Sequence, residues 1–240
     1  MYYTNHIRDD GFGAIFQNLI YDILYVENNG AKFVYSEIPA IDHNYRSEPG
    51  FTAALEKYMG IKEAYPSDGL VKAEVIPFLK SYPTVEQNIN TMFNSAAFYK
   101  MRAAFYKDKV SQFDSTYMNI AVHVRRFNSR DCRTGGTDTP DSYYLNIMNK
   151  IRATYVGAYQ KPLKFHIYSQ GIPISFNEYM ADDVVLHLNE SIQDTFTGFV
   201  FADILVTSQS SFSYVGALLS SGIVYYQKFW HPPLDHWVKC

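Results

Sequence analysis

Short apolar runs of strand length alternate with amphipathic stretches along most of this chain, most regularly in its second half. The runs cover residues 118–122, 163–169, 184–188, 203–207 and 223–226, and helical spacing recurs over 141–159, 174–180, 191–201 and 214–220. Strands that alternate with helices in this way predict an α/β fold with a doubly wound parallel sheet.

The first half begins with a second, smaller α/β pattern. A strand over 1–7, a helix over 14–26 and a strand over 31–35 form a predicted βαβ unit. The proline-rich region that follows predicts short helices near 51–59 and 71–80, and one apolar helical face recurs over 85–109. We therefore predict a first domain over 1–112, a second over 113–227, and an aromatic tail over 228–240 that packs back on the first domain.

Composition narrows the class of protein. Hydrophobic residues make up 47% and charged residues 19% of 240, as in globular proteins, and the formal charge of −3 argues against a nucleic-acid partner. The two cysteines give no disulfide framework, and no apolar run is long enough for a membrane helix. The N-terminus does not resemble a signal peptide, so we expect a cytoplasmic protein without a membrane span. Nothing indicates its oligomeric state.

The most unusual feature is a buried strand that ends in His123-Val124-Arg125-Arg126. Charged groups are costly in a protein interior, so this strand end should open onto a cleft. In an open α/β sheet, ligands bind at the carboxyl edge, and a guanidinium can grip a phosphate with two hydrogen bonds. A structural network between arginine and carboxylate explains these residues equally well.

Two further loops belong to the same predicted edge. Gly11-Phe12-Gly13 precedes the first helix, and the serine-rich turn 208–213 precedes a helix near the C-terminus. Glycines allow close backbone approach, and helix N-termini favour anions. Each loop by itself also fits a tight turn or a capped helix. Together the three loops favour a phosphate-bearing ligand between two α/β halves.

These motifs also carry a family resemblance. The residues 123–126 resemble the HxRR signature of the fucosyltransferase superfamily, which includes the α1,2- and α1,6-fucosyltransferases and the protein O-fucosyltransferases. Gly11-Phe12-Gly13 with Gln17 resembles the N-terminal glycine motif of that superfamily. Residues 191–194, the strand 203–207 and the serine turn 210–213 resemble its C-terminal motif. The order agrees over 11–227, although 38–109 shows no match.

The resemblance implies a GT-B-like fold, two Rossmann-like halves with a cleft between them, and an inverting transfer from a GDP-sugar to a glycan hydroxyl without a metal. It assigns Arg125 to the leaving diphosphate and His123 to the nucleotide base or ribose, and it gives Arg126 a structural role between the halves. The other donor-binding residues it implies are Gly11, Phe12, Gly13, Ser169, Gln170, Ser210, Ser211, Phe212 and Ser213. The sequence has no Asp-x-Asp, cysteine cluster or His-Glu-x-x-His, so we expect no metal and no cofactor besides the donor, most simply GDP-fucose.

Two points remain open. Gln170 stands where the family usually has an acidic residue that reads guanine, and the residues after HxRR are Phe127-Asn128 rather than acidic. A UDP-sugar transferase of the same fold and a non-catalytic binding module are therefore alternatives. An oxidoreductase of the Rossmann type is disfavoured because position 16 is phenylalanine.

An inverting transfer also needs a general base. The candidates are Asp10, followed by Asp138, with Asp131 nearby in the same loop. The acceptor glycan cannot be read from any motif.

Overall fold

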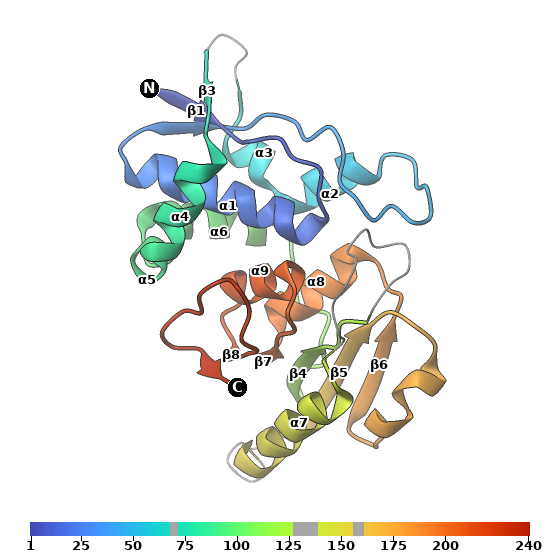
Figure 1. The fold of residues 1–240 in the computed structure, drawn as a ribbon. Coiled ribbons are helices and arrows are strands. Elements are labelled where there is room, and N and C mark those ends of the chain that lie inside the picture. Colours follow the sequence, from blue (N-terminus) through green and yellow to red (C-terminus); the bar gives the residue numbers. More distant parts are fainter. Residues whose placement is uncertain (68–71, 127–138, 156–160) are drawn as a thin grey trace. The chain divides into compact units, whose positions relative to one another are not determined.

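The structure is a computed structural model that describes residues 1–67, 72–126, 139–155 and 161–240. The chain forms two compact units, Met1–Val110 and Ser111–Cys240. Figure 1 shows a parallel sheet with helices in each unit. The division falls inside the polar stretch between the last helix of the first unit and the central strand of the second, close to the predicted boundary.

Unit 1 contains the predicted βαβ motif. Strand β1 (Tyr2–Thr4) leads through helix α1 (Phe12–Asn28) to strand β2 (Lys32–Val34), and both β2 and β3 (Glu74–Val75) pair with β1 in parallel. Over the described residues the strand order is β2-β1-β3. The remaining helices are α2 (Phe51–Met59), α3 (Ile61–Ala64), α4 (Phe78–Gln87), α5 (Ile89–Met92) and α6 (Ala96–Tyr106).

The region between β2 and the unit boundary differs from its prediction in two places. The helix expected over 85–109 is broken between α4, α5 and α6. Ser95 explains one break, because its hydroxyl accepts the backbone N–H of Phe98 and so caps α6. The helix expected over 71–80 is replaced by strand β3 and the start of α4. Both residues of β3 are exposed, so the strand has no apolar alternation that could have revealed it.

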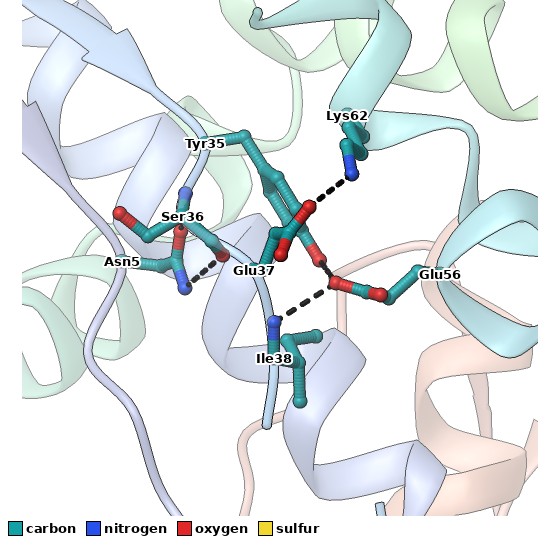
Figure 2. A network of polar contacts seen from close by, with 7 residues as sticks. All are labelled: Asn5, Tyr35, Ser36, Glu37, Ile38, Glu56 and Lys62. Atoms are coloured by element: carbon teal, nitrogen blue, oxygen red, sulfur yellow. Dashed lines mark hydrogen bonds and ion pairs between the residues drawn. The ribbon is translucent and has the colours of Figure 1, made fainter. Parts of the chain in front are cut away.

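A polar network fixes the chain where it leaves β2 (Figure 2). Asn5 exchanges two hydrogen bonds with the backbone of Ser36, at 2.8 and 3.0 Å. One carboxylate oxygen of Glu56 accepts both the Tyr35 hydroxyl and the Ile38 N–H, the latter at 2.8 Å. The network therefore ties the segment after β2 to the end of β1 and to α2, and satisfies backbone groups that no strand pairs.

Asp22 is a buried carboxyl on α1. It is 2% exposed and accepts the backbone N–H of His6 at 3.2 Å. Burial raises its pKa to about 6 despite that hydrogen bond, because the charged form is poorly solvated. The folded chain therefore binds this proton more tightly than the unfolded chain does.

We predict that Asp22→Asn changes the pH dependence of stability. In the wild type, the stabilisation from protonated Asp22 is fully present below pH 3.8 and is lost as pH rises through about 6. An asparagine keeps the acceptor without a charge, so the free energy of unfolding of the variant should rise relative to wild type by about 3 kcal/mol between pH 4 and 7. Urea titrations at each pH measure this difference, and parallel pH curves for the two proteins would contradict it.

Unit 2 is built on a larger parallel sheet. Over the described residues its order is β6-β5-β4-β7-β8-β9. The strands are β4 (Met118–His123), β5 (Leu163–Ser169), β6 (Val184–Leu188), β7 (Ile204–Val206), β8 (Ile223–Tyr226) and β9 (Val238–Lys239). The connecting helices are α7 (Asp141–Tyr155), the 3-10 helix η1 (Pro173–Tyr179), α8 (Ile192–Phe201) and α9 (Ser211–Leu219). The prediction of a parallel α/β fold is confirmed for both units.

The two faces of this sheet differ in character. On one face, α7 and η1 cover an apolar core that includes Ile120, Val122, Phe165, Ile167, Tyr144 and Phe176. On the other face, Phe199 of α8 and Phe212 of α9 pack on His123, and Phe199 also packs on Tyr168. Because side chains alternate along a strand, this second face carries the polar residues of β4, β5 and β6.

The aromatic tail belongs to unit 2. Its strand β9 pairs in parallel with β8, and the ring of Trp237 packs against Tyr214 and Tyr226. The hydroxyl of Tyr226 donates to the carbonyl of His231. Within unit 2 the tail thus extends the larger sheet, and the packing of the tail on the first domain stays a prediction. Strand β9 has two residues, both exposed, so no apolar pattern indicated it.

Candidate functional site at the switch point of the larger sheet

The strand order of unit 2 reverses between β4 and β7. From β4 the chain proceeds outward through α7 to β5 and η1 to β6, and then returns through α8 to β7 on the other side of β4. In doubly wound sheets, ligands bind outside the carboxyl ends of the strands at such a point. The residues that follow β4 and β7 are Val124 to Arg126 and Thr207 to Ser213, so two of the three predicted loops meet here.

His123 joins these two strand ends. Its Nδ1 shares a 2.8 Å hydrogen bond with the hydroxyl of Ser208, and its ring packs against Phe199 and Phe212. Burial, and then the charge of Arg125, lower its pKa to about 3. A neutral histidine therefore lies at the end of β4, where its hydrogen bond to Ser208 holds the loop after β7 against β4. The proposed contact with a nucleotide would have to come from the remaining ring edge.

The two arginines have different surroundings. Arg126 forms an ion pair with Asp141 at the start of α7, and its guanidinium lies 5.1 Å from the centroid of the Phe176 ring. Tyr179 donates to the same carboxylate at 2.6 Å. Arg126 is thus part of a structural network inside unit 2. Arg125 is half-buried, and its charge lies close enough to act on His123.

Two serine side chains of the turn 208–213 form hydrogen bonds within the turn itself. Ser210 caps α9 by accepting the N–H of Phe212 at 3.3 Å, and the buried hydroxyl of Ser213 accepts the N–H of Ser208 at 3.2 Å. The ring of Phe212 packs on Phe196 and Phe199. What the turn can offer an anion is therefore the N-terminal end of α9 and its backbone N–H groups, together with the hydroxyl of Ser211.

The end of β5 is fixed beside the end of β4. The hydroxyl of Ser169 donates to the carbonyl of Val124 at 2.6 Å, directly before Arg125. Gln170 follows and is exposed. Asn189 then makes two hydrogen bonds with the backbone of Gly171, at 2.7 and 3.0 Å, which joins the loops after β5 and β6. Gly171 has φ +134°, a conformation that other residues rarely adopt.

The remaining predicted residues lie in unit 1 or outside the described residues. Gly11 is the N-cap of α1, and a side chain there would collide with the ring of His43. One oxygen of Asp10 pairs with Arg8 at 2.6 Å and the other accepts the N–H of Gly11 at 2.8 Å. Phe12 and Gly13 are buried in the first turn of α1. Asp138, together with Asp131 and the pair 127–128, lies outside the described residues.

Sequence reasoning missed the partners that hold this site in place. Ser208 lies in the predicted serine-rich turn without a predicted partner, and Asp141 lies at the start of the helix predicted over 141–159 without a predicted pairing to Arg126. Both pairs join residues far apart in the chain, so no local spacing could have revealed them. Asn189 did carry a signal in the sequence, because asparagine adopts the left-handed conformation more readily than most residues. In the structure its φ is +58°.

No group of three or more histidine, cysteine, aspartate or glutamate side chains that could hold a metal ion occurs among the described residues. Within the same residues, no helix combines the length and the apolar character needed to cross a bilayer.

Comparison with known proteins gives structural neighbours only. No family model and no curated protein matches the chain. Among solved structures it is similar to the fucosyltransferase NodZ from Bradyrhizobium, with 14% identity, a TM-score of 0.45, and coverage of 91% of this chain and 93% of that one. It is also similar to an Arabidopsis thaliana FUT1 mutant in complex with GDP, with 11% identity, a TM-score of 0.47, and coverage of 98% and 72%.

We predict that Ser208→Ala destabilises unit 2. The change removes the hydroxyl that pairs with the buried Nδ1 of His123, and an unsatisfied buried polar group costs about 1–3 kcal/mol. Urea unfolding at pH 7 measures this loss. Ser175→Ala is the matched control, because Ser175 is exposed on η1 and should stay within about 0.5 kcal/mol of wild type. Equal stability of the two variants would show that the His123–Ser208 contact does not hold the turn.

Proposed function

We propose that this protein is an inverting, metal-independent glycosyltransferase that transfers L-fucose from GDP-fucose to a hydroxyl of a glycan. The observation that supports the proposal best is the hydrogen bond between His123 and Ser208, which joins the ends of β4 and β7 at the switch point of a parallel sheet. Arg125 follows the first of these strands, and the capped N-terminus of α9 follows the second. The motifs that occupy these positions are those that resemble the fucosyltransferase superfamily.

Arg125 and the N-terminus of α9 suit a diphosphate for electrostatic reasons. A guanidinium offers planar donors to phosphate oxygens, and the N-terminus of a helix carries a partial positive charge and unpaired N–H groups. His123 is neutral because of its low pKa, so it adds no charge of its own but can contact a ribose or base. Arg126 pairs with Asp141 inside unit 2, and Arg125 is the arginine that we propose contacts the donor.

The proposed reaction is a single displacement at the anomeric carbon of the donor sugar. The acceptor oxygen forms a bond to that carbon while the bond to the β-phosphate oxygen breaks, and the electron pair leaves with GDP. The acceptor proton passes to a general base. Arg125 and the α9 N-terminus stabilise the charge that grows on the leaving diphosphate, which is the form of stabilisation that contributes most to many enzymes.

Asp10 is our proposed general base. Its carboxylate is oriented by Arg8 and by the N–H of Gly11, and a fixed carboxylate is better placed to accept a proton than a mobile one. Asp138 is the second candidate. The substitutions Asp10→Asn and Asp138→Asn, each assayed for transfer and for donor binding, distinguish the two, because loss of the base lowers turnover without weakening the binding of GDP.

Gln170 favours one alternative, a transferase of the same fold that uses another nucleotide such as a UDP-sugar. It follows β5 beside the proposed diphosphate site, and an amide both donates and accepts, so it does not impose the pattern that a carboxylate would impose on guanine. A binding module without turnover is the other alternative, and a transfer assay with GDP-fucose separates it from the proposal.

We predict that GDP binds with micromolar affinity and that Arg125→Ala weakens binding by at least about 100-fold, as expected for the loss of a charged contact worth about 3 kcal/mol. Isothermal titration calorimetry with GDP and UDP measures both. Lys150→Ala is the control, because Lys150 is an exposed cation on α7 of the same unit, and it should bind GDP like wild type.

Each other outcome has a defined meaning. If UDP binds and GDP does not, the proposed diphosphate site stands and the fucose donor is wrong. If Arg125→Ala and Lys150→Ala behave alike, or neither nucleotide binds the wild type, Arg125 is not a diphosphate ligand and the proposed donor site is wrong.

A further inference from the structure

A cavity of about 500 Å³ lies on the polar face of the larger sheet, apart from Arg125 and the serine turn. It follows β4 and β5 from their amino ends, at Asn119 and Lys164, toward the carboxyl end of β6 at His187. The start of unit 2 and the first turn of α8 complete its wall. The lining residues are Gln112, Phe113, Asp114, Tyr117, Asn119, Lys164, His166, Tyr168, His187, Glu190 and Asp194.

The floor of this cavity is a chain of four hydrogen-bonded side chains. Asn119 Oδ1 lies 3.1 Å from His166 Nε2, His166 Nδ1 lies 2.9 Å from His187 Nε2, and His187 Nδ1 lies 2.7 Å from Glu190 Oε1. Asn119 and His166 are buried, whereas His187 is half-buried and Glu190 exposed. The chain therefore leads from the interior of the unit to its surface.

The positions of the protons in this chain follow from the backbone. Asn119 donates its amide to the carbonyls of Asp114 and Tyr117, so its oxygen must face His166. His166 Nε2 then donates to that oxygen, and its Nδ1 must accept from His187. Burial lowers the pKa of His166 to about 4, in agreement with a neutral ring. His187 then donates from Nε2, and its Nδ1 faces the carboxylate of Glu190.

The charged side chains that line the cavity are mostly acidic. Asp114, Glu190 and Asp194 contribute carboxylates, and Lys164 contributes one cation. Lys164 already donates to the carbonyl of Asp182 at 3.1 Å. Three carboxylates disfavour a phosphate, and no metal-binding group occurs among the described residues. The cavity is therefore suited to a neutral ligand that both donates and accepts hydrogen bonds.

Aromatic rings complete the surface. The ring of Phe113 lies 4.6 Å from that of His166, and Tyr168 stacks on His187 at 4.5 Å. Tyr117 lines the wall beside Lys164. Aromatic faces beside carboxylates, an amide and imidazoles match a sugar ring, which presents C–H groups on its faces and hydroxyls at its edge. The volume is within the range of small-molecule sites.

We propose that this cavity is a saccharide-binding site, separate from the proposed diphosphate site, in which Glu190, His187 and Asp194 contact sugar hydroxyls and Phe113 or Tyr117 packs against the ring. The proposal goes beyond the transferase function and does not depend on it, since Arg125 and the residues of the serine turn do not line the cavity.

The test is NMR of the full chain labelled with ¹³C at histidine Cε1, with His166 and His187 assigned by single His→Gln variants. The probes are methyl glycosides of mannose, galactose, N-acetylglucosamine and fucose, at up to about 50 mM, a range that covers millimolar dissociation constants. At least one glycoside should shift the His187 and His166 signals in a saturable manner, while the signals of His6 and His43 in unit 1 stay in place.

Variants and competitors make the result decisive. Glu190→Gln should weaken binding of the active glycoside by about tenfold or more, as expected for one charge-assisted hydrogen bond. Glu178→Gln, an exposed carboxylate on η1, should leave binding unchanged. Arg125→Ala should also bind the glycoside normally, so failure of the donor site and failure of this site are distinguishable.

Three results would overturn the proposal. If none of the glycosides shifts His187, the cavity holds only water. If GDP shifts His187 and displaces the glycoside, the cavity belongs to the nucleotide site. If inorganic phosphate shifts His187 and the glycosides do not, the cavity is an anion site.

Discussion

The hydrogen bond between His123 and Ser208 is the contact on which the candidate site depends. It joins the carboxyl ends of β4 and β7, the two strands between which the sheet reverses its order. Because the ring is buried and neutral, it can share this bond without the cost of a buried charge. The β7 loop is thereby fixed, and Ser210 and Ser213 can use their hydroxyls to shape the start of α9.

The two arginines after His123 have different surroundings. Asp141 and Tyr179 hold Arg126 against the start of α7, which ties the loop after β4 to the apolar face of the sheet. Arg125, one residue earlier, therefore starts from a fixed backbone. An anion ligand needs a positioned cation, and a structural arginine next to a proposed ligand-binding arginine supplies that positioning.

The sheet of unit 2 also has one apolar face and one face that carries polar side chains. Its apolar face packs under α7 and η1 as ordinary core, whereas its other face carries Asn119, His166 and His187. Buried polar groups are tolerated when they have hydrogen-bond partners. Three successive side-chain hydrogen bonds, which begin at Asn119 and end at Glu190, provide these partners. One sheet thus carries the proposed diphosphate site at its edge and a polar cavity along its face.

The sequence by itself determined the α/β class, the βαβ start of unit 1 and most strands of unit 2, because apolar periodicity and helix caps are local properties. The helix predicted over 191–201, for example, is α8, and the hydroxyl of Ser191 caps it by accepting the N–H of Asp194. The sequence also predicts that Arg125 and the serine turn lie at one edge of the sheet, because the carboxyl ends of parallel strands share an edge.

The tertiary structure decided the rest. The pairing of Arg126 with Asp141, the role of Ser208, the addition of β9 to the sheet and the histidine chain all join residues distant in sequence. Such contacts depend on strand register and helix packing, which no local pattern encodes.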